Sequence, residues 1–191
     1  AVVTQHGHFC ENTALGSQFI LRDSSQSLQI VLMSRAGMLP EADFYCPIPY
    51  QPLQRVTPEA ITALIADGSA GLLDRAFGLM VQEITLADPL WSRQTGLARL
   101  NADNFCDAWF AARQQQDPLI HARKNLQDTR LNTLTKYTVP WRYVILRLHE
   151  VIAGIVPHLD PRDSTRFASG LARVFIDNYA AIPPQSLRRL L

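Results

Sequence analysis

The sequence predicts an α+β protein, in which a small N-terminal antiparallel sheet accompanies a predominantly helical bundle. Two observations lead to this expectation. Short extended runs, rich in β-forming residues, occupy the chain before residue 57. Beyond that point, capping residues followed by proline separate long stretches with helical periodicity. We therefore divide the chain into a β-rich region with a proline-rich linker, residues 1–56, and a helical bundle domain, residues 57–191.

The β-rich region contains three runs that we expect to form strands: SQFILRD (17–23), SLQIVLMS (27–34) and ADFYCPIP (42–49). The polar turn SSQ between the first two predicts a hairpin. Prolines end the third run, because proline cannot donate to a sheet ladder. The preceding VVTQHGHF is expected to be a fourth strand or an ordered arm. The proline-rich PIPYQPLQRVTP predicts an extended connector.

The helical region begins each of several helices with a capping side chain followed by proline. The side-chain oxygen accepts hydrogen bonds from free amides of the first turn, and proline fills a position whose missing N–H costs nothing. Four dipeptides have this form: Thr57-Pro58, Asp88-Pro89, Asp117-Pro118 and Asp160-Pro161. We expect helices over residues 58–66, 69–87, a short stretch after Pro89, 102–115, 118–136, 140–156, 161–181 and the tail.

Two of these helices, 140–156 and 161–181, carry wide apolar faces at helical spacing. Each Leu-sized group left in water would forgo roughly 2 kcal/mol. These two helices are therefore expected at the centre of the bundle.

The composition narrows the classes of function. A formal net charge of +1 gives no global field for nucleic acid or an anionic membrane. The chain has no apolar run of about 18 residues, so no membrane span is expected. The three cysteines, Cys10, Cys46 and Cys106, are odd in number and scattered, which favours a reducing compartment. We expect a cytoplasmic protein.

The stretch HGHFC is a candidate metal site. In an extended strand His6, His8 and Cys10 point to the same side, and His-x-His on a strand lets two imidazoles reach one ion. The alternative is a flexible arm whose histidines bind metal adventitiously.

Two further features are candidate binding surfaces. The helix 118–136 is rich in cations, among them Arg123 and Lys124, and sparse in apolar residues, which fits either a partner or a solvated face. The small sheet has edges that can accept a peptide by strand addition. The residues expected there are Leu28, Ile30, Phe44, Tyr45 and Tyr50. The alternative is that these rings attach the sheet to the bundle.

A hairpin-like stretch (SQFILRDSSQSLQIVLMS, then ADFYCPIP), a proline-rich linker and a helical body without a catalytic set make the layout similar to MbnC. MbnC proteins are the small partner subunits of methanobactin biosynthesis complexes. The resemblance implies a heterodimer with a larger iron-dependent subunit that modifies a precursor peptide, with the iron in that partner and no cofactor in this chain. The likeness is one of layout and length, so it assigns no residue a role.

We therefore expect a non-catalytic partner or adaptor subunit that binds a larger enzyme and a peptide. Two alternatives stay open. One is a small metalloenzyme that uses His6, His8 and Cys10. The other is a helical regulatory protein that binds through the basic stretch 121–147.

Overall fold

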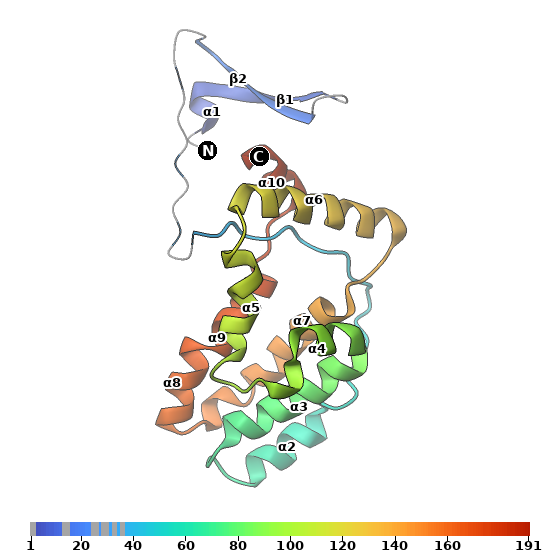
Figure 1. Cartoon of the computed structure of the whole chain (residues 1–191), viewed down its shortest axis with the longest axis vertical. Coiled ribbons are helices and arrows are strands. Elements are labelled where there is room, and N and C mark those ends of the chain that lie inside the picture. Colours follow the sequence, from blue (N-terminus) through green and yellow to red (C-terminus); the bar gives the residue numbers. More distant parts are fainter. Residues whose placement is uncertain (1–2, 13–15, 24–26, 28–30, 32–33, 35–36) are drawn as a thin grey trace.

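The computed structural model confirms the α+β class: a two-stranded hairpin lies at one end of an elongated helical body (Figure 1). It describes residues 3–12, 16–23, 27, 31, 34 and 37–191. The N-terminal part contains helix α1 (Val3–His6) and strands β1 (Gly7–Asn12) and β2 (Gly16–Leu21). The body contains α2 (Pro58–Ala66), α3 (Leu72–Ala87), α4 (Pro89–Thr95), η1 (Leu97–Arg99), α5 (Phe105–Gln114), α6 (Pro118–Thr135), α7 (Pro140–Ala153), η2 (Val156–His158), α8 (Pro161–Ser169), α9 (Leu171–Tyr179) and α10 (Pro184–Leu190).

The hairpin pairs β2 with a different strand from the one that we expected. β1 and β2 run antiparallel in a register that joins Gly7 to Leu21 and Asn12 to Gly16. The aromatic rings of Phe9 and Phe19 face each other across this pair, with their centroids 5.1 Å apart. Such cross-strand aromatic pairs stabilise a sheet, which favours β1 as the partner of β2. In the expected strand 27–34, the described residues 27, 31 and 34 have no regular structure.

The expected third strand, 42–49, is wrong. Ala42 alone forms a parallel bridge, with Ile182, and the chain beyond it runs extended along the body to α2 (Figure 1). Side chains of the bundle bind its backbone amides instead of a neighbouring strand. The amide of Gln51 donates to the Tyr143 hydroxyl (2.7 Å), and three consecutive amides, those of residues 54–56, donate to the carboxylate of Glu83 at 2.5–3.0 Å. The connector is therefore fixed to the bundle over its length.

The predicted helix starts are confirmed. The side chains of Thr57, Asp88, Asp117 and Asp160 each accept a hydrogen bond from an amide of the first turn of α2, α4, α6 and α8. The expected helix 161–181 instead breaks into α8 and α9 at Gly170. A Cβ at this position would lie 3.1 Å from the carbonyl oxygen of Ala102, so the absence of a side chain allows close backbone packing.

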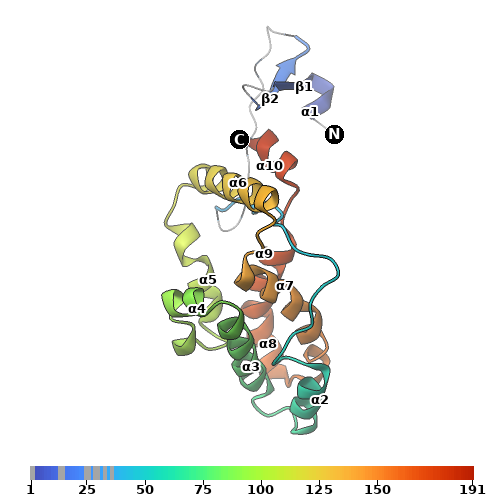
Figure 2. The same ribbon diagram turned by 90° about the vertical axis from the view of Figure 1, so that its right-hand side faces the viewer.

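The core forms around α7, which packs between α3 and α9 (Figures 1 and 2). Its apolar face is buried, as the sequence predicted. The main contributors are Ile145, Leu148 and Ile152 from α7, Met80 and Ile84 from α3, and Val174 and Phe175 from α9. A second, smaller cluster joins Ala42, Ala122 and Leu187, and so attaches α6 and α10 to the connector. Figure 2 shows α6 and α10 at the end of the body that faces the hairpin.

The three tryptophans of the chain meet at the junction of α4, α5 and α7. The rings of Trp91 and Trp141 stack with centroids 4.8 Å apart, and Trp109 lies edge-on to both, at 6.5 and 5.3 Å. The indole N–H of Trp109 donates to Asp177 on α9 (2.8 Å). Among the helices that the structure describes, we find none long and apolar enough to cross a membrane.

The carboxylate of Glu83 gives a test of how the connector is held. It is buried at 4% exposure and accepts three backbone amides. Glu83→Gln keeps the shape but turns one acceptor into a donor that faces those amides. We expect the free energy of unfolding to fall by about 2–3 kcal/mol, measured by urea denaturation. The control is Glu150→Gln, which removes an exposed ion pair between Glu150 and Arg147. It should change the free energy of unfolding by less than about 1 kcal/mol. Equal effects of the two variants would contradict this account.

Candidate functional site

Helix α6 carries the surface that we consider the candidate site. Its inner side is buried: Ala122 and Thr129 are each 2% exposed, and the Asn125 side chain accepts the amide of Ala42 at 2.8 Å. A helix that packs on one side is expected to be polar on the other.

The exposed side of α6 instead carries apolar residues. Ile120, Leu131 and Leu134 are 65%, 58% and 74% exposed. Their spacing of eleven and then three residues places them, with Gln127, on one face of the helix. We call these four residues the outer face of α6.

Charged side chains border the outer face. Arg123 and Arg130 are exposed along one edge, and Lys124 forms an ion pair with Asp128 (2.6 Å) along the other. Three cations therefore accompany a single carboxylate on this helix, apart from His121. The expected cationic character of 118–136 is confirmed, and the exposed apolar residues between the charges add a feature that the overall composition of the helix had hidden.

A buried ionic cluster fixes α6 against the rest of the body. Glu41, on the connector, lies 3.1 Å from Nε2 of His121 on α6 and 3.2 Å from Nη2 of Arg142 on α7. Arg113 on α5 lies 3.9 Å from the same carboxylate and also pairs with Asp177 on α9. One carboxylate of the connector thus links three helices.

The electrostatics of this cluster favour the charged form of Glu41. Burial by itself raises the pKa of the carboxyl group, but the hydrogen bond with His121 and the charges of Arg142 and Arg113 outweigh burial, so the pKa of Glu41 is lowered. Burial also lowers the pKa of Arg142, which Glu41 partly offsets. The guanidinium of Arg142 stacks on the ring of Phe44, 4.3 Å from its centroid.

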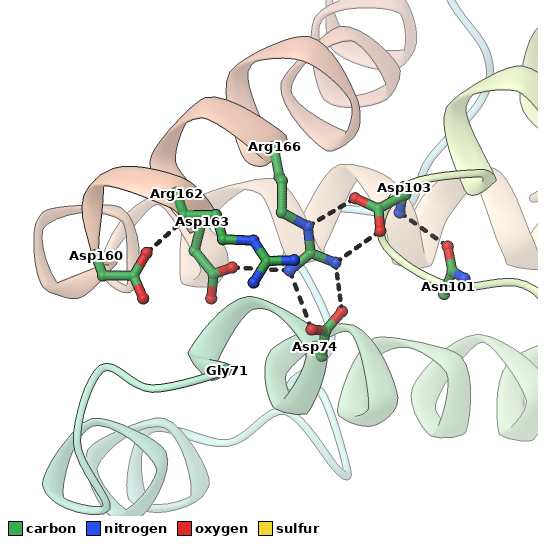
Figure 3. A pocket seen from close by; sticks show the side chains of 8 residues that line it. All are labelled: Gly71, Asp74, Asn101, Asp103, Asp160, Arg162, Asp163 and Arg166. Atoms are coloured by element: carbon green, nitrogen blue, oxygen red, sulfur yellow. Dashed lines mark hydrogen bonds and ion pairs between the residues drawn. The ribbon is translucent and has the colours of Figure 1, made fainter.

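A pocket centred on Arg166 lies at the end of the body opposite α6 (Figure 3). Its guanidinium donates to three carboxylates: Asp74 on α3, Asp103 before α5 and Asp163 on α8, at 2.7–3.0 Å. Asp163 also accepts the amide of Leu73. These five hydrogen bonds use every N–H of the guanidinium. The arrangement is saturated, so we interpret it as a structural clamp between α3 and α8.

Sequence reasoning missed both ionic clusters, because their members lie far apart along the chain. Arg166 meets Asp74 across 92 residues, and Glu41 meets His121 across 80. No spacing between nearby residues of the sequence predicts such pairs. The local signal was only that Arg166 and Asp163 share one side of a helix.

The structure does not bring HGHFC together as expected. His6 ends α1, whereas His8 and Cys10 lie on β1, so the three residues do not share one strand. In the part of the chain that the structure describes, no group of three His, Cys, Asp or Glu side chains is placed to hold a metal ion. The metal role stays a prediction without structural support.

The aromatic residues proposed for peptide binding lie on the connector. Phe44 and Tyr45 are half-buried. Tyr50 packs edge-on against Tyr143, and the guanidinium of Arg147 lies over its ring. The rings of Phe44 and Tyr50 thus contact α7. Leu28 and Ile30 lie outside the described residues.

The fold is that of a helical domain with an appended hairpin. Comparison with known proteins shows the family to which it belongs. Residues 57–179 match the family described as the YdhS-like middle domain. The chain therefore belongs to this family. It is 58% identical over 191 residues to a protein of Escherichia coli (strain K12) named uncharacterized protein YdhS. The chain spans 36% of the length of that relative. No solved structure matches it significantly.

This family membership corrects the resemblance to MbnC, which was wrong. The resemblance rested on layout and length, and many α+β chains share a small sheet followed by helices. The matched family covers residues 57–179 by sequence and is described as the YdhS-like middle domain, not as MbnC. An iron-containing partner and a precursor peptide were implied by the resemblance alone, so both expectations lose their basis.

The Arg166 clamp makes stability depend on pH. The hydrogen bond from Arg166 lowers the pKa of Asp103 below its ordinary value of 3.8. A carboxyl whose folded pKa is depressed contributes stability above the unfolded value, and this contribution is lost as pH falls through the folded value. Arg166→Met also leaves the buried Asp163 without a cation. We expect it to cost about 1–3 kcal/mol at pH 7 and less near pH 2–3, measured by denaturant unfolding.

Arg162→Met is the matched control, because Arg162 lines the same pocket but makes a smaller contribution to the pKa of Asp103. It should change stability by less than about 0.5 kcal/mol at either pH. A deficit of Arg166→Met that is the same at pH 3 and pH 7 would refute the role of the carboxylates.

Proposed function

We propose that this YdhS-like middle domain is a non-catalytic docking domain, which holds a segment of a larger protein on the outer face of α6. The observation that carries the proposal is the exposure of Ile120, Leu131 and Leu134 on a helix whose other side is buried. Exposed apolar side chains along one helix face, bordered by polar residues, are typical of an interaction site.

Burial of this face supplies a driving force for docking. Covering one Leu-sized side chain contributes roughly 1.5–3 kcal/mol; Leu131 and Leu134 lie one turn apart, and Ile120 lies on the same face about three turns away. Tyr137, just beyond the end of α6, is 54% exposed and extends the apolar surface. Tyrosine is enriched among the residues that dominate interface energies.

The charges at the border indicate the chemistry of the partner. Arg123 and Arg130 lie exposed along one edge of the face. An amphipathic segment with acidic residues beside its apolar stripe would match both features. Such charge complementarity raises association rates and rejects wrong partners.

We infer that the partner segment belongs to the same, longer polypeptide. The E. coli relative extends well beyond the matched region, since this chain spans 36% of it, and the family is described as a middle domain. A domain between others is held beside them at high effective concentration, so a modest patch suffices for docking. The free, scattered cysteines Cys10, Cys46 and Cys106 favour the cytoplasm as its compartment.

Hydroxyl-radical footprinting tests the docking role. The isolated domain is compared with a chimera in which this chain replaces its counterpart in the full-length E. coli relative. We expect oxidation of Ile120, Leu131 and Leu134 to fall at least fivefold in the chimera, because the partner segment covers them. Leu90 on α4 is 58% exposed and serves as an internal control whose oxidation stays the same.

The double substitution Leu131→Asp and Leu134→Asp should restore oxidation of Ile120 in the chimera and enlarge its radius of gyration in X-ray scattering. Leu90→Asp should do neither. Both leave the isolated domain folded, since the changed side chains are exposed. Equal oxidation of the outer face in the isolated domain and in the chimera would rule out docking within the polypeptide.

A further inference from the structure

The hairpin of β1 and β2 is a sheet of two strands only. In the described part of the chain these strands pair with each other and with no third strand, so each has a free edge. A two-stranded hairpin alone is marginally stable in water. Helix α10 contacts β2, and the guanidinium of Arg189 lies over the ring of Phe9, 5.1 Å from its centroid. This helix covers part of one face of the hairpin and pairs with neither edge.

The register shows which backbone groups of β2 point outward. The amide of Arg22 donates to the carbonyl oxygen of His6 (2.8 Å), and from this pair hydrogen-bonded and non-bonded positions alternate along the hairpin. Phe19, opposite Phe9, stands at a non-bonded position, and so does Leu21, two residues further along β2. The N–H groups of Phe19 and Leu21 therefore point away from β1. Among the described residues they have no acceptor.

The two edges of the hairpin differ in protection. Proteins guard exposed edge strands with charged residues, prolines or bulges. The sequence of β2, GSQFIL, contains no charged residue and no proline, and its register with β1 runs without a bulge. β1, by contrast, carries Glu11 and follows α1 directly, with Gly7 buried at its start. The outer edge of β2 is therefore the unguarded one.

The position of the hairpin indicates where a third strand comes from. The family match covers residues 57–179, so the hairpin and α10 lie outside it, on opposite sides in the sequence, although they meet in space. Figures 1 and 2 show α1, the hairpin and α10 together at one end of the molecule. The E. coli relative is much longer than this chain, which spans 36% of it. In a protein of that kind the parts that flank the middle domain are held beside the hairpin at high effective concentration.

We propose that the outer edge of β2 receives an extended segment of the same, longer polypeptide as a third strand. The backbone of this segment pairs with the outward groups of Phe19 and Leu21, as in other cases of strand addition. Its side chains alternate between the two faces of the sheet. Those beside Phe19 lie on the side of α10, and those beside Ile20, which is 45% exposed, lie on the other. Both faces offer an apolar neighbour, so the segment is a β-forming run without charges at its centre.

This proposal does not rest on docking at the outer face of α6. It concerns backbone groups of β2, whereas the outer face consists of four side chains on another element. Either contact can therefore fail while the other is observed.

Hydrogen exchange of single amides, measured by mass spectrometry with electron-transfer fragmentation, tests the proposal. The 191-residue chain is compared with the chimera in which it replaces its counterpart in the full-length E. coli relative. In the chimera we expect exchange of the Phe19 and Leu21 amides to slow at least about tenfold, because a third strand accepts them. The amide of Phe9 points outward from the opposite edge and should change by less than about twofold. Unchanged exchange of Phe19 and Leu21, or slowing at Phe9 instead, would overturn the proposal.

A proline at the edge locates the added strand. Leu21→Pro removes an outward amide and no hydrogen bond to β1, because proline is tolerated where the N–H of an edge strand faces away from its partner. In the chimera it should return exchange of the Phe19 amide to within about threefold of the isolated chain. Leu21→Ala is the matched control, which keeps the amide and should leave Phe19 protected. Equal protection of Phe19 in the two variants would contradict strand addition at this edge.

A second copy of the chain is the competing occupant of the β2 edge. If two copies paired through β2, the isolated chain would be a dimer in light scattering, and its Phe19 and Leu21 amides would already be protected. That result would overturn the proposal. A monomer whose two amides exchange freely, and are protected only in the chimera, would support it.

Discussion

The burial of the apolar face of α7 is the constraint on which the rest of this structure depends. Ile145, Leu148 and Ile152 lie at helical spacing and reach almost complete burial between α3 and α9. No single neighbour can cover so wide a stripe, so the bundle must close around this helix. Once α7 is placed, its first turn presents Arg142 to Glu41 and Trp141 to the other tryptophans. The burial of apolar side chains on α7 therefore determines where the ionic cluster of Glu41 and Arg142 lies.

Buried carboxylates of this bundle accept hydrogen bonds from backbone amides, which in a larger sheet would pair with a neighbouring strand. The extended connector needs acceptors for its amides, and Glu83 supplies them from α3. Asp163 serves the amide of Leu73 in the same way while it pairs with Arg166. A buried carboxylate that accepts backbone amides is charge-assisted, and its removal leaves several donors unsatisfied. The Glu83 contacts hold the extended connector against α3, away from the single bridge at Ala42, and the Asp163 contact joins α8 to the first turn of α3.

The sequence predicted the helical part well and the extended part poorly, for a physical reason. Proline after Thr57, Asp88, Asp117 or Asp160 is local chemistry, and all four helix starts are where that chemistry puts them. A run of β-forming residues does not say which neighbour it pairs with, so the sequence predicted a strand over 17–23 and, as one of two alternatives, over VVTQHGHF, but not that these two form the hairpin. Residues 42–49 have the composition of a strand, yet only Ala42 forms a bridge, with Ile182, and the amides that meet side chains of the bundle are those of Ala42, Gln51 and residues 54–56. The cationic residues of α6 were visible in the sequence, whereas the ion pairs of Glu41 and Arg166 depend on contacts made across the fold.

The tryptophan cluster gives the domain a spectroscopic signal that reports on one junction of helices. All three indoles of the chain lie within one junction, so tryptophan emission and the indole bands of the near-ultraviolet circular dichroism arise from a single place. Stacked rings 4.8 Å apart couple their transitions, and the signal responds to small changes of their mutual angle. Unfolding studied by these signals follows the α4–α5–α7 junction, and the hairpin, which contains no tryptophan, is silent in them. Far-ultraviolet dichroism follows all the helices, so a comparison would reveal whether the α4–α5–α7 junction melts together with the rest of the helical body.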